Sequence, residues 1–351
     1  MLSYLYLFLG SVIVTLVVAD FAVTVFISKG AGFITEGVTV AVSKFFKFVS
    51  GNTGIKKVLE YKLVFIIAVM IAGWLVLTWL GVTLIYASDY NSIVNTKTKV
   101  AASFIEKFYF TGYTISTLGQ GDFQPNGINW QVFTSAISLL GFMIITISIT
   151  YIVPVINSEI EKQTLTLLIA SLGQTSHEIL VKGYNNHNFS DLSNQFPELT
   201  NRIFKHSKNH AAYPVLHHVH NSDKTENTIL KLVALDEACT VLLNHVPDDK
   251  CVKNYDLKQL RSSLTYYLKT VRNVNLADEQ PPPPVDDKLR REFDFDFIHT
   301  SETEQEKIYS ELKQRRQLLK ALIEDDGFKW EDINDEVETN FPKSINDNKK
   351  N

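Results

Sequence analysis

The chain has few cysteines and no arginine in its N-terminal half. Its only two Cys residues in 351 are Cys239 and Cys251, which excludes a disulfide-dense extracellular scaffold and is typical of a reducing compartment. The first Arg is Arg202, which excludes an Arg-rich voltage-sensing helix before it. Residues 1–157 carry nine Lys and six acidic side chains, whereas residues 158–351 carry 25 basic and 32 acidic ones. We therefore expect the two halves to lie in different solvents.

Several motifs of enzymes and ligand-binding domains are also missing. The sequence has no nucleophile elbow, phosphate-binding loop or metallohydrolase motif, so we expect no catalysis and no organic cofactor. No Gly-x-Gly-x-x-Gly follows a strand pattern, which argues against a Rossmann-type sensing domain. The acidic C-terminal half argues against nucleic acid as a partner.

What the sequence does contain is three long apolar runs. Residues 2–28 hold one ionisable side chain, Asp20, while residues 63–87 and 130–156 hold none. Each run exceeds the roughly 20 residues that cross a bilayer as a helix. The first run could instead be a cleaved signal peptide, but it lacks a basic n-region, is too long and contains an acid. We therefore predict three spans.

The lysines between the first two runs predict the orientation. Residues 29–62 carry six Lys against two Glu, and an excess of Lys marks the cytoplasmic side. We expect a multi-pass protein of the cell membrane, with its N-terminus outside, residues 88–129 outside and the C-terminal half in the cytoplasm.

Apolar residues recur at helical spacing within the 29–62 segment. This pattern predicts an amphipathic helix lying in the membrane interface. A helix packed against the cytoplasmic ends of the spans is the alternative, and both could hold. The residues that share the apolar face are Ile34, Val38, Val42, Phe45, Phe46 and Val49.

The segment between the second and third runs is too apolar for a solvated loop and too short to span. We predict a re-entrant segment, with a short helix over residues 103–116 whose C-terminus favours a cation. The following run, Thr117-Leu118-Gly119-Gln120-Gly121-Asp122, can turn consecutive carbonyls toward one axis, because glycine reaches backbone conformations closed to other residues. Such carbonyls, with the Thr117 hydroxyl, replace the hydration shell of a cation.

Residues 63–156 resemble the potassium-channel pore-loop family, which has an outer helix, a pore helix, a Thr-x-Gly-x-Gly-Asp filter and an inner helix. Pro125 follows the filter as in many members, and Gly141 falls at the inner-helix position of the family's gating glycine. Tyr109 and Phe110 occupy the positions of the aromatic pair that braces the filter. Pro154 is similar to the proline bend of some inner helices, about one turn later.

The resemblance implies a homotetramer in the lipid bilayer that conducts potassium ions. It assigns ion binding to Thr117, Leu118, Gly119, Gln120 and Gly121. It assigns filter support to Asp122, Tyr109 and Phe110, and gating to Gly141 and Pro154.

The sequence departs from the family at two filter positions. Gln120 stands where potassium-selective members have Tyr or Phe, and Leu118 where they have Val or Ile. Gln120 could hydrogen-bond to the Tyr109 hydroxyl, or it could leave a wider, weakly selective filter. A non-conducting membrane sensor or scaffold with a pore-like core is the remaining alternative.

The extra N-terminal span contains an acid that is costly in lipid. Asp20 should therefore face protein or water. It could pair with a polar group of the outer helix, such as Thr78 or Thr83, or the span could bind a membrane partner. We favour helix packing.

The C-terminal half is predicted to be helical from Glu159 onward and to belong to no family that we recognise. The last helix, at about residues 302–324, could pair with a neighbour or dock on the body. A cytoplasmic ligand or protein could act through this half. The predicted order is an N-terminal span (1–28), an interfacial segment (29–62), a pore domain (63–156), a helical domain (157–276), a Pro-rich linker (277–300), a helical segment (301–340) and a disordered tail (341–351). The expected fold class is thus an all-α membrane protein.

Seven of the nine His lie between residues 177 and 220. Such spacing could ligate a transition metal, but no Cys and no paired carboxylate accompanies them, so we favour a His-rich surface, with a pH response as a further alternative. The metal candidates are His206, His210, His217, His218 and His220.

Overall fold

The chain divides into two units in the computed structural model, which describes residues 2–27, 31–53, 61–185, 187–213, 215–216, 223–244, 246, 254–271 and 302–333. The membrane unit comprises Met1–Ser158 with Ala211–Val219, and the C-terminal unit comprises Glu159–His210 with His220–Asn351. The linker expected at residues 277–300, the tail expected at 341–351 and Cys251 lie outside the described residues.

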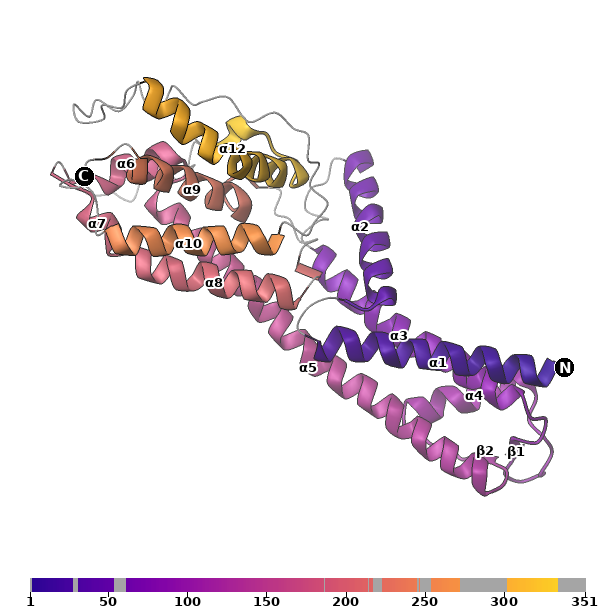
Figure 1. The fold of residues 1–351 in the computed structure, drawn as a ribbon. Helices are drawn as coiled ribbons and strands as arrows, with labels where there is room; N and C mark the ends of the chain where they lie inside the picture. Colours follow the sequence, from indigo (N-terminus) through magenta and orange to yellow (C-terminus); the bar gives the residue numbers. More distant parts are fainter. Residues whose placement is uncertain are drawn as a thin grey trace, which may run out of the picture. The chain divides into compact units, whose positions relative to one another are not determined.

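The membrane unit is built from helices and one small pair of strands. Its elements are α1 (Leu2–Phe26), α2 (Phe33–Thr53), α3 (Lys62–Ala87), β1 (Ile93–Asn95), α4 (Phe104–Ile115), β2 (Phe123–Pro125) and the first part of α5 (Ile128–Leu172) (Figure 1). Helices α1, α3 and α5 are long and apolar enough to cross a membrane. The all-α membrane class with an extra N-terminal helix is therefore confirmed. Helix α5 continues through Pro154 to Leu172, past the predicted inner-helix end at residue 156.

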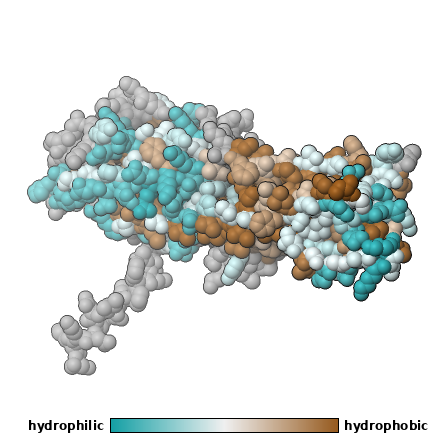
Figure 2. Space-filling model, turned by 90° about the horizontal axis from the view of Figure 1, so that it is seen from below, coloured by the Kyte–Doolittle hydropathy of each residue, from teal (hydrophilic) through white to brown (hydrophobic). Residues whose placement is uncertain are grey.

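Hydrophobic surface gathers on the membrane unit. Figure 2 shows brown, hydrophobic residues over the apolar helices, whereas teal, hydrophilic residues predominate on the C-terminal unit. Large apolar side chains such as Phe8 and Leu5 of α1 and Val132 of α5 are more than half exposed. This distribution is what lipid contact requires of a chain whose backbone groups are satisfied inside its helices.

Helices α1 and α3 cross closely because glycines meet at the crossing. A Cβ on Gly10 would come within 2.5 Å of the Gly81 carbonyl oxygen, and a Cβ on Gly81 within 2.9 Å of the Val14 side chain. Small residues at such crossings let membrane helices pack backbone to backbone. The N-terminal helix is therefore packed closely on α3.

Asp20 is the buried acid of α1, and it is fully hydrogen-bonded. Its carboxylate accepts from the backbone N–H groups of Ile34 (2.7 Å) and Thr35 (3.3 Å), from the Thr35 hydroxyl (2.8 Å) and from the Trp74 indole N–H (2.8 Å). It thereby caps the positive N-terminus of α2 from another helix. The expected pairing of Asp20 with a polar group of the outer helix is confirmed through Trp74. The two examples, Thr78 and Thr83, were wrong, because both hydroxyls donate to carbonyls of their own helix.

Helix α2 packs against α3 through part of its predicted apolar face. Val42 and Phe46 are buried, and the Phe46 ring lies 5.5 Å from the ring of Phe65. Phe45 does not take part in this packing, because it is 57% exposed, and the predicted contact of the apolar face with the membrane interface stays a prediction. The helix thus packs on the end of α3 and still presents aromatic side chains, including Phe48, outward.

The C-terminal unit is a helical bundle around α9. Its elements after α5 are α6 (Ser176–Gly183), α7 (Ser190–Ser193), α8 (Phe196–Ala212), α9 (Thr228–Asn244), α10 (Asn254–Val271), α12 (Glu302–Asp325) and the 3-10 helix η3 (Trp330–Ile333). Helix α9 is buried on nearly all sides. Cys239 belongs to this core, and burial raises the pKa of its thiol to about 12, which makes it inert.

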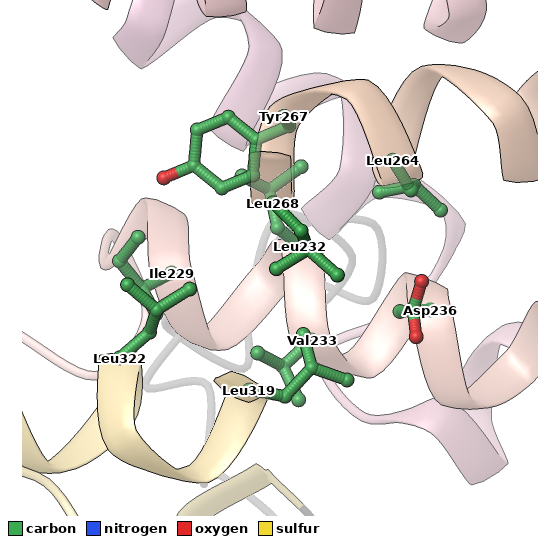
Figure 3. Close-up of a pocket in the computed structure, with 9 residues that line it drawn as sticks. All are labelled: Ile229, Leu232, Val233, Asp236, Leu264, Tyr267, Leu268, Leu319 and Leu322. Carbon is green, nitrogen blue, oxygen red and sulfur yellow. The ribbon is translucent and has the colours of Figure 1, made fainter. Parts of the chain in front are cut away.

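Helix α12 docks on the body of its own chain. Leu319 and Leu322 line a small cavity together with Leu232 of α9 and Leu264 of α10 (Figure 3). Docking on the body, one of the two alternatives for the last helix, is therefore what this chain adopts. The contact is largely apolar, and buried charges border it.

Buried ion pairs join α12 to α9 beside this cavity. Asp236 forms ion pairs with Arg315 of α12 and, at 2.7 Å, with Arg261 of α10. Glu237 pairs with Arg316 of α12 at 3.0 Å. The Arg316 guanidinium also lies 5.3 Å from the centre of the Trp330 ring. Burial raises the pKa of Glu237, and Arg316 opposes that rise. Because these charges are desolvated, removing one of them would leave its partner buried and unpaired, which destabilises the fold.

A short segment after α8 returns to the membrane unit. The Tyr213 ring lies 5.9 Å from the ring of Tyr151 on α5, and Val215 and Leu216 are buried in the same cluster as Val155. The chain therefore links the two units through α5 and again through this segment, which belongs to the membrane unit.

Candidate ion pathway

Helix α4 is a short, well-capped helix that ends at the strip of residues 117–121. Ser103 and Glu106 form a capping box at its start, each side chain bonding the other's backbone N–H. The Trp79 ring stacks on Phe108 at 4.4 Å, and its indole N–H donates to the Phe108 carbonyl at 2.7 Å. Helix α3 thus holds α4 in place, and the partly negative C-terminus of α4 lies beside the strip.

Left-handed residues alternate along the strip. The φ angles of Thr117, Gly119 and Gly121 are +59°, +60° and +83°, while Leu118 and Gln120 have negative φ. A Cβ on either glycine would meet no atom within 4 Å. The glycines are therefore required by backbone conformation and not by space. Thr117 adopts this region although it is β-branched, which marks a strained position.

The first N–H groups of the strip point into the protein, whereas the carbonyls of residues 117–120 have no hydrogen-bond partner among the described residues. The N–H groups of Thr117 and Leu118 donate to the carbonyls of Thr114 (3.1 Å) and Tyr113 (2.9 Å) at the end of α4. Among the described residues, none donates to the carbonyls of residues 117–120, and the whole strip is exposed in the single chain. Four consecutive carbonyl oxygens are thus available for a cation.

Two tyrosines of α4 bond the residues that directly follow the strip. The Tyr109 hydroxyl donates to Asp122 (3.4 Å) and not to Gln120, for which the described residues offer no hydrogen bond. The Tyr113 hydroxyl donates to the Phe123 carbonyl at 2.9 Å. Phe110 faces α3 instead, where its ring lies 5.4 Å from that of Tyr86. Sequence reasoning missed Tyr113, because the family pattern drew attention to the pair before it.

Gly141 of α5 lies against the end of α4. A Cβ there would collide with the carbonyl oxygen of Ile115, two residues before the strip. Gly141 therefore has a packing role, in addition to the gating role that the family resemblance assigns to it. Pro154 lies within the continuous helix α5, where its carbonyl accepts from the Ser158 hydroxyl at 2.7 Å.

Lys107 is a second residue that sequence reasoning missed. Its ammonium is buried and donates to the carbonyls of Tyr86 (3.1 Å), Asp89 (2.6 Å) and Tyr90 (3.2 Å), at the C-terminal end of α3. A cation at a helix C-terminus satisfies carbonyls that have no intrahelical partner. Lys107 therefore joins α4 to α3 at the end remote from the strip. No local sequence pattern predicts this role of Lys107.

The histidines do not form a metal site in the described part of the chain. His206 and His210 are buried, at 4% and 8% exposure, with ring centres 5.6 Å apart, and His206 stacks on Tyr267. The prediction of a surface position was therefore wrong for these two, whose stripe on α8 faces the core. No group of three potential ligands occurs among the described residues, and His217, His218 and His220 lie outside them.

Lys231 of α9 gives the C-terminal unit a predictable pH dependence. It donates to the Gln174 carbonyl (3.1 Å), and burial lowers its pKa from 10.5 to about 8, opposed by Glu178 and Asp223. Below pH 8 the folded and unfolded states both hold the proton, so the burial penalty is fully present. Between about pH 8 and 10.5 the unfolded state binds more protons, and this group's contribution to stability rises with pH.

We expect Lys231→Met to be at least as stable as the wild type at pH 7 and to lose the alkaline rise. Melting temperatures of the full chain from pH 7 to 10 measure both effects. Lys208→Met on the exposed side of α8 is the control, and it should keep the wild-type profile. An unchanged profile in Lys231→Met would contradict the assignment of the rise to Lys231.

Comparisons with known proteins agree with this geometry. A family model described as ion channel matches residues 64–158. The uncharacterized membrane protein YdjJ of Bacillus subtilis (strain 168) is 30% identical over 328 residues, which cover 93% of this chain and 95% of that protein. No solved structure matches the chain. The matched residues contain α4, the strip and the membrane part of α5.

Proposed function

The chain belongs to the same family as the membrane protein YdjJ, and its residues 64–158 match a family model described as ion channel. On that premise we propose that it forms a homotetrameric, potassium-conducting channel. The observation that carries the proposal is the row of unpartnered carbonyls on residues 117–120. A cation that sheds water needs oxygens in such a row. The Thr117 hydroxyl adds an oxygen at one end.

Four copies are needed because one strip can only face an ion from one side. Closed cyclic symmetry places identical strips around one axis. Support comes from the strip's exposure in the single chain, where Leu118 is 64% exposed although it adjoins the well-packed end of α4. The lipid bilayer would surround the assembly, with the N-terminus outside and the C-terminal unit in the cytoplasm, as the lysines of residues 29–62 indicate.

The C-terminal unit is proposed to control the gate. Helix α5 carries Gly141 beside the strip and runs unbroken to Leu172, past the division between the units at Ser158. The segment from Tyr213 to Leu216 is a second covalent route between them. A movement of the C-terminal unit would therefore act on α5 at two places, and a ligand or protein in the cytoplasm could cause it.

The test of conduction uses purified full-length protein in liposomes. We expect cation uptake driven by a potassium gradient, and an assembly mass of four chains by light scattering. Protein that inserts as a tetramer and carries no current under any ionic condition would contradict the channel and favour a sensor with a pore-like core.

Gln120 determines how strongly the proposed channel selects potassium. The Tyr109 hydroxyl bonds Asp122 in the structure, so no bond from this tyrosine fixes the Gln120 side chain. We expect Gln120→Tyr to raise potassium over sodium selectivity severalfold, because an aromatic ring would pack behind the strip and hold its width. Reversal potentials under bi-ionic conditions measure this. Equal values for both proteins would contradict a strip loosened by Gln120.

A further inference from the structure

A two-stranded ladder adjoins one end of the strip. Strands β1 and β2 pair antiparallel, with Ile93 opposite Pro125, Val94 opposite Gln124 and Asn95 opposite Phe123. The next pair in register is Thr96 and Asp122, and the Thr96 N–H donates to the Asp122 carbonyl at 2.9 Å. The ladder therefore extends up to the last residue of the filter motif.

The Thr96 side chain reaches one residue further. Its hydroxyl donates to the Gly121 carbonyl at 2.7 Å. Gly121 thus differs from residues 117–120, whose carbonyls receive no donor from the described residues. A carbonyl oxygen has two lone pairs, so the bond fixes its direction and leaves one lone pair free.

A tight turn holds Thr96 in position. The Asn95 side chain accepts from the N–H groups of Lys97 and Thr98, both at 3.0 Å, and the Asn95 N–H donates to the Val100 carbonyl at 2.9 Å. Lys99 closes the turn in the left-handed region, at a φ of +60°. The hydroxyl that meets Gly121 is therefore presented by an ordered loop with its own hydrogen bonds.

We propose that Thr96 is a positioning residue for the cation pathway, which orients the Gly121 carbonyl through its hydroxyl and so sets the geometry of the last cation site of the strip. This inference rests on the proposed conduction through residues 117–121. Discrimination between cations depends on where the coordinating oxygens are held. Without the hydroxyl, the Gly121 carbonyl turns freely and the site binds potassium more weakly.

Three variants of the full-length protein separate the hydroxyl from the fold. Thr96→Val keeps the size and the backbone bond to Asp122 but removes the hydroxyl, and Thr96→Ser keeps the hydroxyl. Thr98→Val is the matched control in the same turn, since its hydroxyl only accepts a 3.4 Å bond from the Val100 N–H. Thr96→Ala replaces Thr96→Val if valine disturbs assembly.

Two readouts are measured on each variant. The potassium concentration that gives half of the potassium-dependent rise in melting temperature should increase at least about fivefold to tenfold in Thr96→Val, because one lost hydrogen bond has about that effect and the tetramer would lose one in each subunit. Potassium over sodium selectivity from reversal potentials should fall in parallel. Thr96→Ser and Thr98→Val should stay within about twofold of the wild type, well inside that effect.

The outcomes distinguish this inference from the proposed function. If the wild type conducts and Thr96→Val matches it in both readouts, the role of Thr96 is overturned and the proposed function is not. A Thr96→Ser variant as impaired as Thr96→Val would overturn that role as well, because the hydroxyl would then not be the cause. A wild type with neither current nor potassium-dependent stabilisation would overturn the proposed function, and this inference with it.

Discussion

Substitution of Gly119 by alanine is expected to abolish potassium uptake while leaving the tetramer intact. The φ of Gly119 is +60°, and a Cβ there would meet no atom within 4 Å, so the penalty comes from the backbone conformation alone. A left-handed conformation costs an L-residue about 1–2 kcal/mol. Four copies around one axis multiply this to about 4 kcal/mol or more, which corresponds to roughly a thousandfold loss of the conducting arrangement.

Gly127→Ala is the matched control for this prediction. Gly127 has a φ of +88° and equally open surroundings, but it lies between β2 and α5, outside the strip. It should carry the same backbone strain and keep most of the uptake. Flux from liposomes and the assembly mass are measured on both variants. Undiminished, selective flux in Gly119→Ala would remove residues 117–121 from the role proposed for them.

The parts of the fold that were predictable are those with local signals. Long apolar runs with at most one ionisable residue predicted α1, α3 and α5, because length and polarity alone decide whether a helix can span. The alternating glycines predicted the left-handed positions at Gly119 and Gly121, since few other residues adopt them. These inferences needed no knowledge of which segments meet.

The contacts that were missed span long sequence separations. Asp20 caps α2 and bonds Trp74, which is 54 residues away, and Lys107 binds carbonyls at and just after the end of α3. Thr96 reaches Gly121 only because β1 and β2 pair in one particular register. No periodicity or spacing encodes such contacts, so they become visible only when the packing is known.

Gly141 has a packing contact that the sequence did not indicate, and its gating role stays a prediction. The family pattern identified it as a gating glycine, and low helix propensity supports a flexible point. The structure adds that its missing side chain admits the carbonyl of Ile115. A substitution there would therefore disturb the end of α4 as well as the flexibility of α5, and its effects on gating and on the strip would be mixed.

The docking of α12 offers a cleaner way to test the proposed control by the C-terminal unit. Asp236 lies in that unit, remote in sequence from residues 117–121, and it lines the cavity that Leu319 and Leu322 of α12 close (Figure 3). Its carboxylate holds Arg261 and Arg315, whose side chains are only 15% and 14% exposed. Removing it leaves two desolvated cations without their partner.

We expect Asp236→Ala to destabilise the docking of α12 by about 3–5 kcal/mol, the cost of breaking a buried ion pair from one side. Hydrogen exchange of the full chain should then show protection on α9 and α12 reduced by about a hundredfold or more. Glu324→Ala is the control on the same helix. Its pair with Lys320 spans 3.7 Å and is partly exposed, so its loss should cost well under 1 kcal/mol.

The same two variants decide whether docking reaches the gate. If the C-terminal unit controls α5, Asp236→Ala should shift the open probability in single-channel records and leave potassium over sodium selectivity unchanged, because Thr117–Gly121 and their supports lie in the membrane unit. Glu324→Ala should change neither quantity. An open probability that stays at the wild-type value while α12 exchanges freely would show that the docked helix stabilises the C-terminal unit without controlling conduction. A loss of selectivity would instead mean that the strip senses the C-terminal unit directly, since α5 packs against the end of α4 at Gly141.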